Sequence, residues 1–265
     1  MAEPIDELRA TARVWAPDFY VSALLAPRAA RRDLIALASF LGDIERIVAT
    51  VSDPALAEIR LQWWREAIAG AEKNERTGHP IGDALGETIR AHNLPFAEFD
   101  GLLDARALDL YADAMTQDGA LAAYLDKADG AAFGLAAGCL GSRDASPLIA
   151  ASGRAYGLTR IVSKLPVFLA RGRIPFPGFD ATGPIQLRVA ADDCRQRARE
   201  SLAQARIAWR TASRTERSAC LPLAVVEAYL KAAERPGHDP ARMLADVEPL
   251  TRMWRLWAAH MTGRF

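Results

Sequence analysis

The sequence has no net charge, no long hydrophobic run and no signal peptide pattern. Its 33 Lys and Arg residues balance 33 Asp and Glu residues, so the overall charge gives no indication of a nucleic-acid partner. No stretch reaches the roughly 18 uninterrupted apolar residues that a membrane-spanning helix needs, and the N-terminus carries acids where a signal peptide is apolar. We therefore expect a cytoplasmic protein without a signal peptide or a transmembrane helix.

Cysteine and histidine are scarce and form no motif. Cys139, Cys194 and Cys220 lie far apart and make no CxxC pair, which argues against a zinc site or a disulfide framework. We expect them to act as small buried apolar residues. The four histidines occur in turn-like or terminal contexts, and GxSxG, GxGxxG and P-loop patterns are missing. Nucleophilic catalysis and nucleotide binding therefore have no support.

Helical periodicity is what the sequence does have. Apolar residues recur three and four positions apart from end to end, and alternating strand-like runs are scarce, which predicts an all-α protein. No break resembles a linker, so we predict one domain over residues 1–265. Pro166 should kink its helix or end it near Leu165. The predicted helices are 28–48, 53–74, 81–92, 96–113, 118–139, 146–170, 186–213, 219–234 and 247–262.

Positive charge gathers in residues 186–217. This stretch has four more basic than acidic residues. It is either a solvated helix face or a surface for an anionic lipid or an acidic protein partner. The basic residues are Arg188, Arg195, Arg197, Arg199, Arg206, Arg210, Arg214 and Arg217, and the acidic ones are Asp192, Asp193, Glu200 and Glu216.

The segment EIRLQWWREAI (58–68) is the most distinctive in the chain. Arg60 and Trp64 share one helical face, four residues apart, and Trp63 belongs to a neighbouring face. The two adjacent indole rings must therefore point in different directions. We expect one to fill the core and the other to border a cavity or cover a packed helix, with an acceptor for its N–H group.

Together with its surroundings, this segment resembles the squalene/phytoene synthase family, whose members carry a similar RLxWWR helix. The resemblance covers residues 18–180 with several motifs in order and is weaker over the C-terminal helices 186–262. The matching segments are Tyr20 with LLAP (24–27), Arg31 and ALASF (36–40), then LLDARALDL (102–110) with Asp104 and Asp109, YLDKADGAAFG (124–134) and GLTRIVSKLPVFLARGRIPFP (157–177).

The resemblance implies an all-α isoprenoid-synthase bundle in which two prenyl diphosphates condense head to head. In that family, two acid-rich helical motifs hold Mg²⁺ ions that clamp the diphosphate as it leaves. This chain departs from the pattern at both motifs. The first motif position reads Glu45, Arg46 and Ala49, and the second reads Arg160, Lys164 and Phe168.

A divalent cation between these positions would meet more positive than negative charge. We therefore expect no metal cofactor and no catalytic residues, with Mg²⁺ required only if the chain is a prenyltransferase after all. Two readings of the reversed charge stay open. In the first, the cations pair with Glu45, Asp104 or Asp109 and close the cavity opening at which the family holds its metal ions. In the second, Arg160, Lys164 and Arg173 form a basic pocket for a phosphate or an anionic lipid head group. Candidate pocket or anion-binding residues are Tyr20, Arg60, Trp63, Trp64, Asp104, Asp109 and Arg173.

Within the family, the segment 38–68 looks most like the branch that contains the mitochondrial respiratory complex I assembly factor and its bacterial relatives. That resemblance implies a non-catalytic protein that assists assembly of complex I or another membrane complex, peripheral at the inner membrane, with respiratory subunits as partners. Two alternatives remain: a divergent head-to-head prenyltransferase and an isoprenoid- or lipid-binding protein.

The C-terminal segment WRLWAAHMTGRF (254–265) places Trp254, Trp257 and Met261 on or near one helical face. We predict that this face packs onto the bundle. The alternative is an interfacial membrane anchor.

Overall fold

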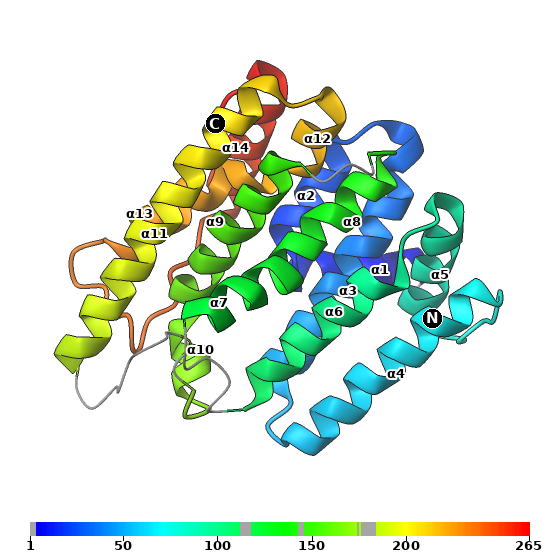
Figure 1. The fold of residues 1–265 in the computed structure, drawn as a ribbon, viewed down its shortest axis with the longest axis horizontal. Coiled ribbons are helices and arrows are strands. Elements are labelled where there is room, and N and C mark those ends of the chain that lie inside the picture. The colour runs from blue at the N-terminus through cyan, green and yellow to red at the C-terminus, as the bar shows by residue number, and fades with distance from the viewer. Residues whose placement is uncertain (1–3, 112–117, 143–145, 174, 176–183) are drawn as a thin grey trace.

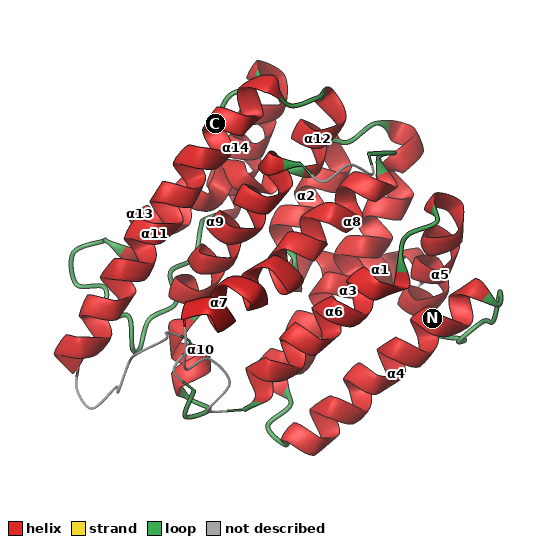
Figure 2. Ribbon diagram, viewed as in Figure 1, coloured by secondary structure: helices red, strands yellow, loops and turns green. Residues whose placement is uncertain are grey.

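The computed structural model describes residues 4–111, 118–142, 146–173, 175 and 184–265. These residues form helices and loops, without a strand among them, so the predicted all-α class is confirmed (Figure 2). The helices are α1 (Pro4–Trp15), α2 (Pro17–Leu25), η1 (Arg28–Ala30), α3 (Arg31–Thr50), α4 (Pro54–Glu72), α5 (Pro80–His92), α6 (Phe96–Ala107), η2 (Leu108–Leu110), α7 (Asp118–Leu125), the π-turn η3 (Asp126–Gly130), α8 (Ala131–Cys139), α9 (Pro147–Ser163), α10 (Leu165–Leu169), α11 (Pro184–Thr211), α12 (Arg214–Ala219), η4 (Leu221–Val225), α13 (Val226–Ala233) and α14 (Pro249–Thr262).

The helices begin where the local sequence favours a start. Proline stands in the first turn of α4, α5, α9 and α14, where its missing N–H group would have no partner within the helix. The carboxylate of Asp53 accepts from the N–H of Ala55, and the hydroxyl of Ser146 accepts from the N–H of Leu148. These caps place the N-termini of α4 and α9 close to the predicted positions.

Two differences from the predicted helices have physical reasons. Helices α1 and α2 were not predicted. In α1 the reason is a narrow buried face that uses small residues such as Ala12. The predicted helix 146–170 is divided, since α9 ends at Ser163, Lys164 leaves helical geometry, and α10 starts with Pro166 in its first turn. The predicted effect of Pro166 is confirmed.

The helices run largely side by side, with α4 at one edge of the bundle and α11 at the opposite edge (Figure 1). One buried apolar cluster lies among α3, α4, α5, α6 and α8, and a second lies among α7, α9, α11 and α13. Phe19 of α2 packs against both clusters, and its ring is tilted by 45° to that of Phe133, with centroids 5.2 Å apart. The interpretation of the chain as one domain stays a prediction.

The two adjacent tryptophans divide between the core and a packed helix as the sequence indicates, but the acceptor predicted for the covering ring belongs to the core ring. Trp64 is the core residue, 1% exposed, and its indole N–H donates to Asp43 Oδ2 at 3.0 Å. Trp63 is half-buried and covers the start of α5, where its ring lies edge-on to His79 with centroids 5.2 Å apart. Trp64 therefore anchors α4 to α3, and Trp63 anchors it to α5.

The C-terminal helix differs from the prediction. Helix α14 packs against η4 and α2 through Leu256 and Ala259. Trp254, Trp257 and Met261 point away from the bundle and are 64%, 45% and 64% exposed. The prediction that these three side chains pack onto the bundle is therefore wrong.

All three cysteines are buried and unpaired, as predicted, and burial raises the pKa of each thiol to about 12. None of the described helices combines the length and apolar content needed to cross a bilayer.

Candidate functional site

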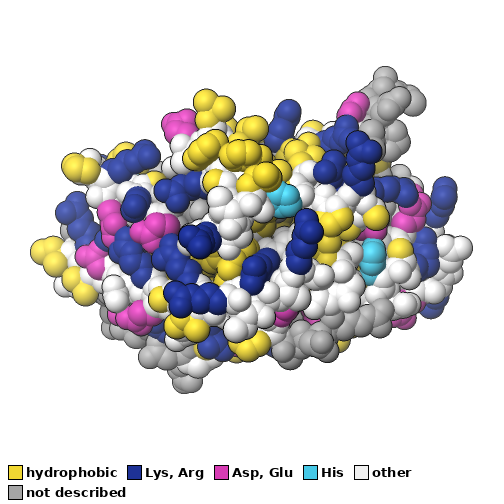
Figure 3. Space-filling model, turned by 90° about the horizontal axis from the view of Figure 1, so that it is seen from above, with side chains coloured by type: hydrophobic (Ala, Val, Ile, Leu, Met, Phe, Trp, Pro, Cys, Tyr) yellow, Lys and Arg dark blue, Asp and Glu magenta, His cyan; other side chains and the backbone are white. Residues whose placement is uncertain are grey.

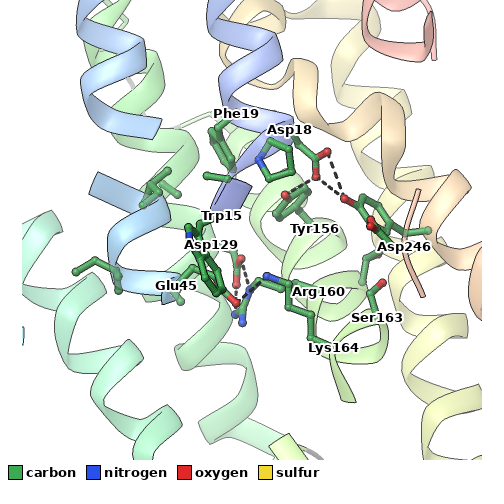
Figure 4. Close-up of a pocket in the computed structure, with 18 of the residues that line it drawn as sticks. Trp15, Asp18, Phe19, Glu45, Asp129, Tyr156, Arg160, Ser163, Lys164 and Asp246 are labelled. Carbon is green, nitrogen blue, oxygen red and sulfur yellow. Dashed lines mark hydrogen bonds and ion pairs between the residues drawn. The ribbon is translucent and has the colours of Figure 1, made fainter. Parts of the chain in front are cut away.

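A cavity of about 360 Å³ lies between the N-terminal helices and α9. Its apolar wall includes Trp15, Phe19 and Ile44, and a polar cluster lines it at each end. Figure 4 shows Glu45, Asp129, Arg160 and Lys164 around one end and Asp18, Tyr156 and Asp246 around the other. The volume falls at the lower end of the range of small-molecule sites.

The first cluster centres on Glu45, which α3 carries into the cavity. Lys164 Nζ lies 2.7 Å from Glu45 Oε1, and Arg106 Nη2 of α6 lies 2.6 Å from Oε2, so both carboxylate oxygens are engaged. Burial alone would raise the pKa of Glu45, but the charges of Lys164, Arg106 and Arg160 outweigh it and hold the pKa far below its ordinary value. Glu45 is therefore a carboxylate neutralised by side chains of this chain.

Arg160 of α9 makes a second ion pair on the same side of the cavity. Its Nε and Nη2 donate to the two oxygens of Asp129 at 3.0 and 2.8 Å. The two parallel bonds give the fork geometry in which arginine binds carboxylates most strongly. Arg160 Nη2 also donates to the hydroxyl of Tyr124 at 2.8 Å.

Two glycines of α9 permit this pairing. A Cβ atom on Gly153 would lie 2.5 Å from Gly130 Cα, and one on Gly157 would lie 2.5 Å from Asp129 Oδ2. The missing side chains let α9 approach the π-turn η3 closely. Asp129 belongs to that turn, so the unusual backbone and the close approach together bring its carboxylate to Arg160.

Asp109 forms a third layer of this network, behind the cavity wall. Its carboxylate pairs with Arg106 Nη1 at 2.7 Å and with Arg173 Nη1 at 2.8 Å, and it accepts from the hydroxyl of Tyr124 at 3.0 Å. Arg173 is 1% exposed and also donates to the carbonyl of Leu108. Arg173 therefore pairs with Asp109 and does not line the cavity.

The second cluster centres on Asp18 of α2. Arg252 Nε of α14 lies 2.8 Å from Asp18 Oδ1, and the hydroxyl of Tyr156 donates to Oδ2 at 2.7 Å. Tyr229 of α13 donates to the same carboxylate at 3.2 Å, and Arg252 Nη2 also pairs with Asp246 at 3.0 Å. Burial raises the pKa of Asp18 above its ordinary value, although Arg252 and the two tyrosines act against this.

The two motif positions contribute unequally to the cavity. Glu45, Arg160 and Lys164 line it, whereas Phe168 is buried in the second apolar cluster with its ring 5.4 Å from the Arg173 guanidinium carbon. Arg46 turns back to Asp43 on its own helix, its Nε donating to Asp43 Oδ1 at 3.0 Å. Ala49 lies one turn further along α3 and is half-buried.

The structure places the seven candidate pocket residues away from the cavity lining. Arg60 and Asp104 are exposed, and Asp104 pairs with Arg65. The other five belong to the buried interior or pack against it. They are Tyr20, Trp63 and Trp64 beside the first apolar cluster, and Asp109 and Arg173 in the layer behind Tyr124.

Sequence reasoning missed several residues that build the two clusters. Arg106 and Asp129 lie inside LLDARALDL and YLDKADGAAFG. Both segments resemble family motifs, so their position there could have marked the two residues as candidates. Asp18, Tyr156 and Arg252 gave none, because more than 130 residues separate Asp18 from each partner. The pairing expected for the reversed charges occurs at Glu45 and Asp109, and Asp129 is an acceptor that was not foreseen.

These residues do not fit a magnesium clamp. Mg²⁺ needs oxygen ligands in near-octahedral geometry, and Glu45 is the one carboxylate at the two motif positions. Its two oxygens already contact Lys164 and Arg106, and Asp129 is engaged by Arg160. A cation placed here would displace these pairs and face the released positive charges.

A model of the squalene/phytoene synthase family matches residues 13–255. Among curated proteins, the chain is similar to the protein described as "NADH dehydrogenase (ubiquinone) complex I, assembly factor 6" from Mus musculus and from Bos taurus, 24% and 25% identical over 160 residues. These alignments cover 60% of this chain and 48% of the relatives, so the chain spans about half the length of the curated relatives it matches.

Solved structures give the fold. Squalene synthase HpnC from Alicyclobacillus acidocaldarius superposes with a TM-score of 0.72 and 22% identity, covering 89% of this chain and 95% of that one. A dehydrosqualene synthase in complex with ligand superposes with a TM-score of 0.73 and 14% identity, covering 98% and 99%. The predicted bundle of isoprenoid-synthase type is confirmed.

Proposed function

The chain belongs to the squalene/phytoene synthase family, and from this premise we propose that it does not transfer prenyl groups but assists assembly of respiratory complex I or another membrane complex. The observation that carries the first half is the pair of contacts that Lys164 and Arg106 make to Glu45. This chain's own cations stand where the family resemblance puts a metal-binding acid motif.

The arrangement is a poor device for ionising a diphosphate. Loss of that group needs cations that are free to neutralise the negative charge that develops on the diphosphate as the bond breaks. Here Lys164 and Arg106 are held by Glu45, and Arg160 is held by Asp129 through two hydrogen bonds. Releasing them would leave buried carboxylates without partners, which is costly.

The assembly role is drawn from the curated relatives. They are described as assembly factors of complex I, and their likeness covers 60% of this chain at low identity. The segment 38–68, which carries both Glu45 and Trp64, provides the strongest resemblance to that branch in the sequence. Partners of this chain would be subunits of the respiratory complex, and the chain would act peripherally at the membrane.

Catalysis is tested by incubating the purified protein with Mg²⁺ and farnesyl or geranylgeranyl diphosphate, beside an authentic synthase of the family. We expect no head-to-head product from this chain under conditions where the control is active. Product formation by the wild type that is lost in Glu45→Gln would contradict the proposal and restore the prenyltransferase alternative.

Assembly is tested in a deletion strain of the source organism. We expect lower complex I activity in membranes, restored by the wild-type gene and by Ser163→Ala, since Ser163 lines the cavity and is only 5% exposed. Co-purification with tagged protein should enrich complex I subunits. Normal complex I activity together with no enrichment would contradict the assembly role.

One observation favours a second function, binding of an isoprenoid or lipid with an anionic head. Arg160 Nη1 and Ser163 Oγ are buried, belong to residues that line the cavity, and find no hydrogen-bond partner among the described residues. An anionic head group would satisfy both. Between the two polar clusters the wall includes the apolar side chains of Trp15, Phe19 and Ile44, which the tail of such a ligand could contact.

Native mass spectrometry of the purified protein tests this function with a matched pair of variants. Ser163→Ala removes the free hydroxyl. Thr159→Val also changes the cavity wall, but its hydroxyl is already bonded to the carbonyl of Ala155 at 2.7 Å. We expect a co-purified lipid mass that Ser163→Ala weakens and Thr159→Val keeps. No bound lipid in the wild type would count against this function.

A further inference from the structure

The outer face of α14 is apolar and has no partner among the described residues. Leu250, Met253, Trp254, Trp257 and Met261 are each at least 45% exposed, and Leu250 reaches 81%. At about 100° per residue they fall within one stripe about 100° wide. The rings of Trp254 and Trp257 lie beside each other, tilted by 32°, with centroids 5.1 Å apart. A continuous stripe of this kind marks an interaction surface, unlike single exposed apolar residues.

Positive charge borders this stripe. Residues 249–265 contain three arginines and neither Asp nor Glu. Arg255 and Arg264 share a shallow groove with Leu250 and Trp254. The C-terminal end of α11 adds Arg206, whose Nε donates to the carbonyl of Phe265 at 3.2 Å. In a chain with no net charge, this end is locally basic.

The neighbouring turn extends the basic region. Residues 203–217 hold Arg206, Arg210, Arg214 and Arg217 against one acid, Glu216, which caps α12 through Ser213. Helix α14 lies toward the upper end of the molecule in Figure 1, the side from which Figure 3 is drawn. Figure 3 shows Lys and Arg side chains around a group of hydrophobic side chains on that face.

We propose that the exposed face of α14 is a docking surface for an anionic phospholipid bilayer. Tryptophan and leucine enter the head-group region of a bilayer, while flanking arginines pair with lipid phosphates. The inference deepens the proposed peripheral role by naming the surface that meets the membrane. Its test requires neither complex I nor the cavity, so it can fail independently of the assembly role.

The chemistry of the face favours a bilayer over a protein. The stripe follows one side of a 14-residue helix about 21 Å long, and its two neighbouring indoles sit on the solvent side. The charged side chains beside the stripe, Arg255 and Arg264, have a single sign, which suits a surface of repeated phosphates. Arg252 points inward to Asp18 and fixes α14 to α2, so the helix is presented as a rigid element.

Vesicle co-flotation tests the proposal with the full chain. Vesicles are made of phosphatidylcholine alone or of phosphatidylcholine with phosphatidylglycerol. We expect binding to the second kind, weakened by salt. The double variant Trp254→Gln/Trp257→Gln should bind at least about tenfold more weakly, since two buried indoles contribute more than the ~1.4 kcal/mol of a tenfold change.

A matched control separates this face from general surface hydrophobicity. Leu56 and Ile59 of α4 are 54% and 65% exposed and lie three residues apart, so Leu56→Gln/Ile59→Gln removes a similar exposed pair at the edge of the bundle formed by α4. This variant should bind vesicles like the wild type. Arg255→Gln/Arg264→Gln should reduce binding and its salt dependence, whereas Arg60→Gln should change neither.

Three results would overturn the proposal. The wild type could fail to bind vesicles of either composition. The tryptophan variant could bind as well as the wild type, with both folded by circular dichroism. Light scattering could show a dimer that the tryptophan variant breaks, without vesicle binding, which would assign the face to a second copy of the chain.

Discussion

Glu45 and Asp18 are two carboxylates beside the same cavity, and their surroundings move their pKa values in opposite directions. Glu45 meets Lys164 on one oxygen and Arg106 on the other, and its pKa lies far below the ordinary value. Asp18 meets one cation, Arg252, and two tyrosine hydroxyls, and its pKa is raised. Burial is the largest single influence on both and acts in the same direction.

Both carboxyl groups are buried, so the number of neighbouring cations, and not burial, decides the direction in which each pKa moves. Neutral donors such as the tyrosine hydroxyls stabilise a carboxylate less than a full charge does. Arg252 also divides its charge between Asp18 and Asp246. Glu45 with Lys164 and Arg106 forms an ion-pair cluster, here called the ionic lock, that keeps the carboxylate charged. The fold instead favours the protonated form of Asp18, which lacks a second full charge beside it.

Glu45→Ala should have the largest effect on stability. It leaves the buried guanidinium of Arg106 paired with Asp109 instead of with two carboxylates and exposes Lys164 to solvent, which costs about 3 kcal/mol of unfolding free energy, the lower end of the range for breaking a buried ion pair. Urea denaturation at neutral pH measures it. The control is Glu87→Ala, which removes an exposed ion pair with Arg32 and should cost about 0–1 kcal/mol. Equal losses in the two variants would show that the lock does not stabilise the bundle.

Arg252→Met should have the next largest effect, a loss of about 2–3 kcal/mol of unfolding free energy at neutral pH. This is less than the cost of leaving a buried carboxylate charged and without a partner. Asp18 can take up a proton, because its pKa is already raised and losing Arg252 raises it further. The folded variant then binds more protons than the unfolded chain, so its stability improves as the pH falls. Denaturation at neutral and mildly acidic pH should show a shrinking difference from the wild type. A constant difference would mean that Asp18 stays charged.

The sequence predicted the helices well and the ion pairs only in part. Periodicity located most helices because their apolar faces are large, and Pro166 marked the break after α9. Helix α1 escaped because its buried face relies on alanine. Asp129 escaped because its position depends on a π-turn and on the missing side chain of Gly157, and neither is visible in a helical pattern.

The tryptophans show the other limit of the sequence. A stripe such as Trp254, Trp257 and Met261 is identical in sequence whether it faces a core or solvent, so periodicity alone could not assign α14. Adjacent Trp63 and Trp64 were separable by face, but which of them reaches the core depends on Asp43, the acceptor on α3. Long-range partners supply the missing information in each case.

The pH dependence of two nearly isosteric variants should give opposite slopes, each at most about 1.4 kcal/mol per pH unit. Because its pKa is lowered, ionised Glu45 stabilises the folded state at pH values above the ordinary glutamate pKa. The stability advantage of the wild type over Glu45→Gln should therefore shrink as the pH falls below that ordinary pKa. A raised pKa means that Asp18 stabilises least when charged. The unfolding free energy of the wild type should therefore fall relative to that of Asp18→Asn as the pH rises above the ordinary aspartate pKa. Slopes of the same sign would refute the comparison.

Lys164→Met should have the smallest effect on stability, at most about 1 kcal/mol, because the lysine side chain is 37% exposed and solvent screens its charge. Its effect on Glu45 is the sharper test, since it removes the largest of the charges that lower the pKa of that carboxyl. The pKa should move up toward the ordinary value, as a carboxyl-detected NMR titration of Glu45 would measure. Arg154→Met, which breaks the exposed pair with Asp126, is the control and should leave Glu45 unchanged. If Glu45 stays low without Lys164, Arg106 and Arg160 are sufficient to hold it charged, and the lock needs fewer cations than the comparison with Asp18 implies.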